Sequence, residues 1–133
     1  MRTLQNRLAS EDGFAVIEGL LAFGLVLLVV AVAIQTFAYA HARSVALAAA
    51  QDGAETAAIS GLDAGARRAQ DVLTAAGGVG AHLRPTGSLS ADEVTIRVDG
   101  LAPSLFSVSA LLPPIAVSAS APLERYPINE TAP

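Results

Sequence analysis

The pattern of apolar and polar positions divides the chain into one long apolar segment and a shorter, patterned remainder. Residues 19–40 carry no charge, and only Gln35 and Thr36 among them are clearly polar. About 20 apolar residues in a helix, at about 1.5 Å rise each, cross the roughly 30 Å hydrocarbon core of a bilayer. A secretory signal peptide has a shorter apolar core of about 7–15 residues. The segment therefore predicts a single transmembrane helix.

The helical pattern continues past the end of the apolar segment. The first proline of the chain is Pro85, and residues 41–60 are rich in alanine, the strongest helix former. We expect one helix over residues 14–60, about 70 Å long, which would extend beyond a bilayer. The polar residues 1–13 ahead of it are expected to be a leader peptide and not a folded element.

Alanine recurs at every fourth position of the extended half, and the same register runs back into the apolar segment. Residues four apart share one face of a helix, where small side chains let two helix backbones approach closely. Because this half is rich in alanine throughout, such a row can also arise by chance. If the row is a helix-packing surface, its members are Ala22, Ala38, Ala42, Ala46 and Ala50.

A second, shorter helix is predicted after the break at residues 60–61. The apolar positions of residues 62–76 recur at helical spacing, with charged side chains on the other side. Asp63 is the predicted N-cap, and the glycines at residues 77–78 end the helix. This amphipathic pattern fits a helix packed on a small sheet.

Strands are predicted in the last part of the chain. Residues 93–99 alternate polar and apolar, mostly β-branched, side chains, which is typical of a half-buried strand. Weaker patterns cover residues 79–84, where Pro85 would stop the strand, and residues 115–123. The period change from helix to strand indicates a small antiparallel sheet of about three strands.

The predicted fold class is α+β: a long N-terminal transmembrane helix extending outside the membrane, then a short helix and the small sheet. Residues 61–125 form an extracytoplasmic head, and residues 126–133 a polar tail. Within the head, residues 101–114 carry no charge, and a short helix beginning at Pro103 and an irregular apolar loop both fit them. Such a segment either caps the core or, if exposed, needs a partner.

The composition excludes several classes of function. The chain has no cysteine, which excludes disulfides, thiol catalysis and cysteine-type zinc sites. Eight basic residues stand against twelve acidic ones, so no basic surface is available for direct nucleic-acid binding. His41 and His82 lack metal-ligand spacing, and no nucleotide or hydrolase motif is present. We therefore predict no enzyme activity, no cofactor and no metal site.

Glu18 needs an explanation because it is an acid at the edge of a spanning segment. Ionisable residues in such segments cost free energy and are usually retained for a partner. Glu18 either reaches the lipid head groups or pairs with a cation. Cleavage after Gly13 would create one, since the new α-amino group of Phe14 lies four residues, about 6 Å, from Glu18. That amine could neutralise the Glu18 of its own chain or of a neighbouring chain.

These residues resemble a known processing signal. The run Gly13-Phe14-Ala15-Val16-Ile17-Glu18 before a long apolar helix is similar to the class III signal of type IV pilin-like proteins. Within that superfamily the chain most resembles the TadE-like minor pilins (pseudopilins) of the tight-adherence (Tad, Flp-type) pilus, through residues 48–58 and 119–125. The match is good over residues 13–60 and loose elsewhere. The resemblance implies cleavage by a prepilin peptidase after Gly13 and a role for Glu18 in subunit assembly.

The resemblance also implies partners and a location. A minor pilin assists or primes assembly of an appendage used in adhesion, secretion or DNA uptake. Its partners are other pilin subunits, pilus assembly platform proteins, prepilin peptidase and membrane lipid. Arg2 and Arg7 favour an N-terminus inside the cytoplasmic membrane and a head outside, later on a cell-surface pilus. Two alternatives stay open: an uncleaved single-pass protein with a binding head, and a type II secretion pseudopilin.

Overall fold

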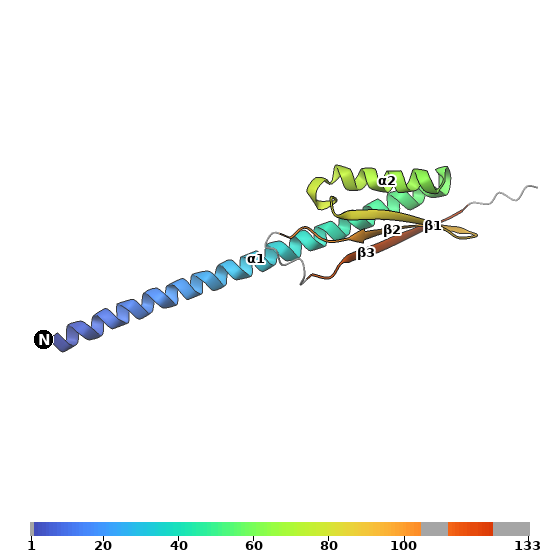
Figure 1. The fold of residues 1–133 in the computed structure, drawn as a ribbon. Coiled ribbons are helices and arrows are strands. Elements are labelled where there is room, and N and C mark those ends of the chain that lie inside the picture. The colour runs from blue at the N-terminus through green and yellow to red at the C-terminus, as the bar shows by residue number, and fades with distance from the viewer. Residues whose placement is uncertain (1, 105–111, 124–133) are drawn as a thin grey trace, which may run out of the picture. The chain divides into compact units, whose positions relative to one another are not determined.

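The computed structural model describes residues 2–104 and 112–123, with side chains from residue 13 onward. It has the predicted α+β class: a long N-terminal helix, a short helix and a three-stranded antiparallel sheet (Figure 1). The chain divides into two compact units, Met1–Phe37 and Ala38–Pro133. The elements are α1 (Arg2–Ser60), α2 (Leu62–Ala75), the 3-10 turn η1 (Gly77–Val79), β1 (Leu83–Leu89), β2 (Glu93–Gly100) and β3 (Ile115–Pro122).

The first unit is the N-terminal part of α1. This helix begins at Arg2, well before residue 14, where the sequence pattern placed its start. Residues 2–12 include leucine, glutamine, arginine, alanine and glutamate, which are good helix formers, and no proline. A single glycine such as Gly13 weakens a helix without ending it. The prediction that the leader is not a folded element is therefore wrong for its backbone.

The second unit contains the rest of α1 and all the other elements. From here on we call this whole unit the head, so the name now includes residues 38–60 of α1 as well as the residues predicted for the head. The chain reverses between α1 and α2 at Gly61, whose φ of 92° is a conformation that glycine adopts readily and other residues rarely do. Gly61 is the N-cap of α2, and Asp63 lies in the first turn, so the prediction of Asp63 as N-cap is wrong. Its carboxylate still suits the positive end of the helix dipole.

The sheet has the order β1-β2-β3, with both pairs antiparallel. The strand predicted at residues 93–99 is confirmed as β2, and the one predicted at residues 115–123 as β3. β1 differs from the prediction, because it begins at Leu83 and continues through Pro85 and Gly87. β1 lies at an edge of the sheet, where a proline costs no ladder hydrogen bond if its nitrogen faces outward.

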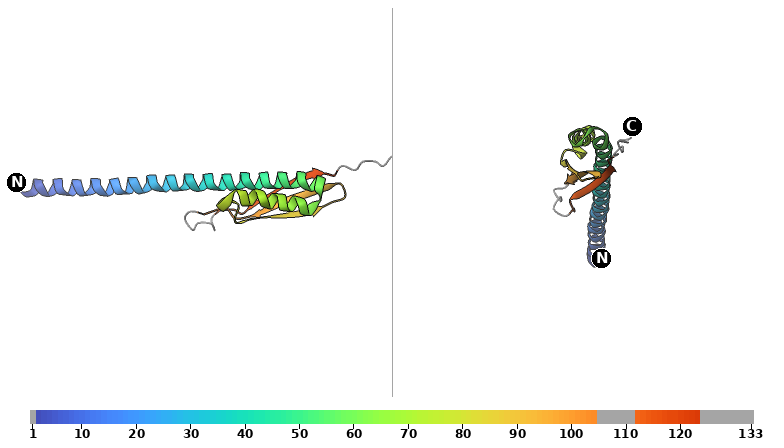
Figure 2. Two further views of the ribbon diagram at one scale, coloured as in Figure 1. Left: turned by 90° about the horizontal axis from the view of Figure 1, so that it is seen from above. Right: turned by 90° about the vertical axis from the view of Figure 1, so that its right-hand side faces the viewer.

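The core of the head lies between the sheet and the two helices, and α2 lies alongside the C-terminal part of α1 (Figure 2). Alternate residues of each strand face inward, among them Ile96 of β2 and Ile115 of β3, both almost fully buried. The sheet therefore has one apolar face and one exposed, polar face. From α2 the core receives Gly65, Ala69 and Leu73. From α1 it receives Ala42, Ala46, Ala49, Ala50, Gly53, Ala54 and Ala57.

The uncharged segment between β2 and β3 is described only in part. Residues 101–104 and 112–114 form neither helix nor strand. The predicted choice between a short helix and an irregular loop at residues 105–111 lies outside the described residues, as does the predicted tail.

Candidate functional site

The junction of leader and apolar segment lies within continuous helix. Gly13, Phe14 and Glu18 are all exposed, and Phe14 exposes 71% of its surface. Phe14 and Glu18 are four residues apart, which places them on one face of α1, about 6 Å apart along its axis. None of the ion pairs among residues with described side chains involves Glu18. The Phe14 nitrogen is a neutral amide in the intact chain, so a cation there requires cleavage.

The apolar segment of the first unit presents its side chains outward. Every large apolar residue from Phe14 to Phe37 exposes at least 47% of its surface. Soluble monomers rarely expose continuous apolar patches beyond a few hundred Å². The helical span Gly13–Ser60 is long and apolar enough to cross a membrane. Lipid or another apolar helix is the environment that such a surface requires.

The alanine row has a different environment in each unit. Ala22 is exposed, and Ala38 is half-buried. Ala42, Ala46 and Ala50 have no exposed surface and belong to the core of the head. The row in the head is thus a packing surface for the protein's own sheet and helix α2, and a second chain cannot reach it. For Ala22, contact with a neighbouring helix stays a prediction.

α1 and α2 cross at two glycines. A Cβ atom on Gly53 would lie 2.9 Å from the Ala69 Cβ and 3.0 Å from the Gly65 carbonyl oxygen. A Cβ atom on Gly65 would collide with the Ala57 Cβ and the Gly53 carbonyl oxygen. Only glycine lets the backbones come this close. The crossing positions α2 on the sheet and so determines the shape of the head.

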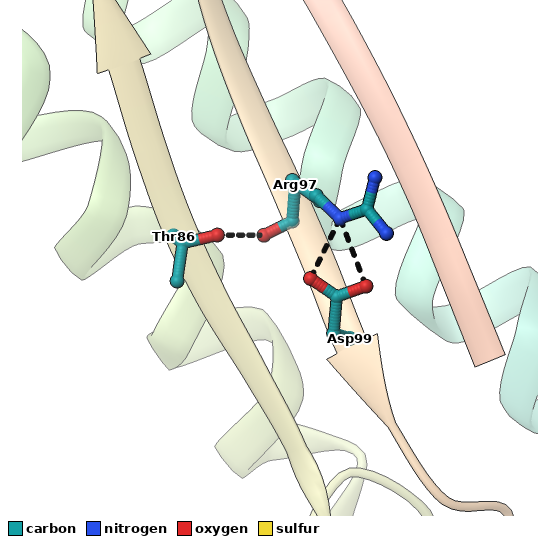
Figure 3. A network of polar contacts seen from close by, with 3 residues as sticks. All are labelled: Thr86, Arg97 and Asp99. Atoms are coloured by element: carbon teal, nitrogen blue, oxygen red, sulfur yellow. Dashed lines mark hydrogen bonds and ion pairs between the residues drawn. The ribbon is translucent and has the colours of Figure 1, made fainter. Parts of the chain in front are cut away.

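The outer face of the sheet is polar. Arg97 Nε donates hydrogen bonds to both carboxylate oxygens of Asp99, at 2.9 and 2.8 Å, and the Thr86 hydroxyl donates to the Arg97 carbonyl oxygen at 3.4 Å (Figure 3). The hydrogen bonds that Arg97 donates to Asp99, and the negative charge of that carboxylate, raise the pKa of Arg97 above its usual value. The hydroxyls of Thr95 and Ser120 lie 2.8 Å apart. All these contacts are exposed, so the face is hydrated and not a desolvated reactive site.

The part of the chain that the structure describes contains no cluster of three or more His, Cys, Asp or Glu side chains able to hold a metal ion. His41 is exposed on α1, and His82 is exposed immediately before β1. The residues predicted from sequence to act in processing and assembly thus all lie on α1.

Two structural features were missed by sequence reasoning: the glycine crossing and the continuation of β1 through Pro85. The crossing had a signal, because small residues recur at spacing four in both helices, which favours close helix approach. These residues are Gly53 and Ala57 in α1 and Gly65 and Ala69 in α2.

Comparison of the chain with protein-family models, with curated proteins and with solved structures found no match. A function for the chain therefore has to be argued from its own residues and from the resemblance of its junction.

Proposed function

We propose that the protein is a minor pilin, or pseudopilin, of a Tad-like pilus, cut by a prepilin peptidase between Gly13 and Phe14. The observation that carries the proposal is Glu18, an acid in the exposed apolar part of α1, four residues after Phe14 of the Gly-Phe junction. The resemblance to TadE-like proteins is the reason for proposing a Tad-like pilus and its prepilin peptidase.

Insertion into a membrane follows from the exposed apolar surface of residues 14–37. Arg2 and Arg7 keep the short N-terminal segment in the cytoplasm under the positive-inside rule, and the head then lies outside. Lipid covers the apolar surface before assembly. Neighbouring pilin helices cover it afterwards.

Cleavage creates a positively charged α-amino group at Phe14, which can pair with the carboxylate of Glu18. An acidic side chain costs about 2.5–3.5 kcal/mol at the bilayer centre and less near an edge. A free α-amino group, with a usual pKa of about 7.7–8.0, is mostly protonated at neutral pH. Pairing the Phe14 amine with Glu18 of a neighbouring subunit neutralises both charges as the helices leave lipid. The pair therefore favours assembly over the isolated, membrane-bound subunit.

The helix surface available to neighbours lies in the first unit. Gly19 and Gly24 have no heavy atom within 4 Å of where a Cβ would stand, so a neighbouring backbone can approach there. The buried alanines of the head are not available for this purpose. Assembly contacts are therefore expected along residues 14–37, with the head at the filament surface.

The test compares two charge-neutralising variants of the full chain in a pilus-forming host. Glu18→Gln keeps the shape of the side chain and removes its charge, and Glu55→Gln does the same at an exposed position of the head. Glu18→Gln should insert into the membrane normally and lose most of its recovery in sheared pili. Glu55→Gln should behave as wild type. Equal recovery of the Glu18→Gln chain in pili would contradict the proposal.

A second pair of variants tests recognition by the peptidase. Gly13→Leu and Gly24→Leu both introduce a side chain where the structure has open space, so neither should disturb the fold. Gly13→Leu should block cleavage, and Gly24→Leu should leave it intact. If both chains are cut equally, Gly13 is not the processing position. A chain that is never cut would instead fit a single-pass protein with a binding head.

A further inference from the structure

The two edges of the sheet differ in whether they can accept another strand. The order β1-β2-β3 makes β1 and β3 the edges. An open edge strand presents unpaired backbone N–H and C=O groups, and proteins usually block it with proline, charge or a covering element. The hydrogen bonds of the head show which groups each edge presents.

Two backbone hydrogen bonds at strand ends show which residues of each edge strand direct their backbone groups toward β2 and which direct them away. The Ser90 amide donates to the Glu93 carbonyl at 2.8 Å, and the Leu123 amide donates to the Asp92 carbonyl at 2.9 Å. In an antiparallel pair, hydrogen-bonded residue pairs alternate with non-bonded pairs. Along the observed register, odd-numbered residues of β1 and even-numbered residues of β3 therefore direct their backbone groups away from β2.

The edge of β1 is blocked along its first half. Leu83 points its N–H outward, but this group already donates to the Gly80 carbonyl at 3.1 Å. Pro85 is the next outward residue and has no N–H. A strand added to this edge would find no donor at either position.

The edge of β3 carries no such protection. Its outward residues Ala116, Ser118 and Ser120 each present an N–H and a C=O, and their small side chains are exposed on the polar face. The strand has no charged residue; its one proline, Pro122, is its last residue, and Pro113 and Pro114 precede its first, so prolines occur only at the two ends of this edge. No backbone hydrogen bond between described residues closes it.

We propose that this edge pairs with β3 of a second copy, antiparallel and centred on Ser118. Pro114 and Pro122 are equally far from Ser118 in sequence, so the outward donors are distributed symmetrically about it. In this register Ser118 faces Ser118 of the second copy, and Ala116 faces Ser120. Each facing pair exchanges two backbone hydrogen bonds. The strand brings no charge to repel its copy, and its small side chains do not clash.

The direction of β3 determines how the two paired heads are oriented. Gly87, late in β1, packs against Leu62 at the start of α2, whereas Gly80, just before β1, packs against Leu73 near its end. β1 thus runs opposite to α2, and β3 runs in the same direction as residues 38–60 of α1 (Figure 1). Antiparallel pairing reverses these helices in the two copies. The pairing therefore joins two heads whose residues 38–60 run in opposite directions.

Cysteine cross-linking of the full chain in detergent tests the register, since the natural chain has no cysteine. Facing residues of a hydrogen-bonded pair lie about 5.5 Å apart at Cα, within disulfide range, so Ser118→Cys should give at least about tenfold more disulfide-linked dimer than Thr86→Cys, on β1. Ser120→Cys alone should not cross-link, but should do so with Ala116→Cys. Equal cross-linking of Ser118→Cys and Thr86→Cys would overturn the proposal.

A charge variant completes the test, which does not depend on pilin processing. Ser118→Lys places two like charges opposite each other and should abolish cross-linking between the Ala116→Cys and Ser120→Cys chains, whereas Ser88→Lys, exposed on β1, should not. Unchanged cross-linking with Ser118→Lys would contradict the pairing.

Discussion

The glycine crossing of α1 and α2 makes the stability of the head sensitive to a single methyl group. In Gly65→Ala the new Cβ meets the Ala57 side chain and two backbone positions, the Gly53 carbonyl and the Ala57 Cα. Backbone atoms cannot rotate away, so the helices have to separate. Overpacking of this kind costs about 1–3 kcal/mol. Alanine gains about 0.5–1 kcal/mol over glycine inside a helix. Because two of the three contacted atoms are backbone, the overpacking cost should be about 2–3 kcal/mol, and the net loss in free energy of unfolding about 1–2.5 kcal/mol.

The assay is urea unfolding of the full chain in detergent, with the folded fraction of the head measured by pulse proteolysis. Gly78→Ala is the matched control, because it adds the same methyl group where nothing lies within 4 Å. Its midpoint should stay close to that of wild type. The double variant Gly65→Ala with Ala57→Gly removes one of the collisions and should recover part of the loss expected from the two single changes.

The result that would refute this reasoning is a Gly65→Ala chain as stable as wild type or more stable. The helix propensity of alanine would then outweigh any contact at the crossing. In that case α1 and α2 would not approach each other as closely as the structure shows.

Three further changes are expected to separate core, turn and surface contributions in the same unfolding assay. Ile96→Ala empties a fully buried position at the centre of β2 and should lower the free energy of unfolding by about 2–5 kcal/mol; a smaller loss would place Ile96 outside the core. Gly61→Ala forces a side chain into a φ of 92° and should lower the free energy of unfolding by about 1–2 kcal/mol; an unchanged midpoint would contradict this. Arg97→Ala removes only an exposed ion pair with Asp99 and should leave the midpoint and its salt dependence unchanged.

The parts of the fold that follow from local pattern were predictable. β2 alternates polar and apolar residues over its whole length, so its inward face, with Val94, Ile96 and Val98, was evident. The bounds of β1 were not, because Pro85 and Gly87 normally argue against a strand. The reason that they are tolerated is tertiary: β1 is an edge, and Leu62 occupies the space that a side chain at residue 87 would fill.

The positions of the candidate site residues on α1 were predictable, but not all their environments. Gly13, Phe14 and Glu18 lie where a continuous helix must place them, since helix geometry alone determines their spacing. The alanine row was ambiguous because periodicity identifies a packing face without identifying its partner. Ala42, Ala46 and Ala50 face the protein's own core, which depends on where the sheet folds back. No pattern confined to α1 contains that information.

The most direct test of the central claim is the intact mass and N-terminal sequence of the protein recovered from membranes, with and without an active prepilin peptidase. The proposed function predicts that the chain begins at Phe14 when the peptidase is active and retains residues 1–13 when it is not. A chain that keeps the residues before Phe14 in the presence of active peptidase would contradict the pilin assignment.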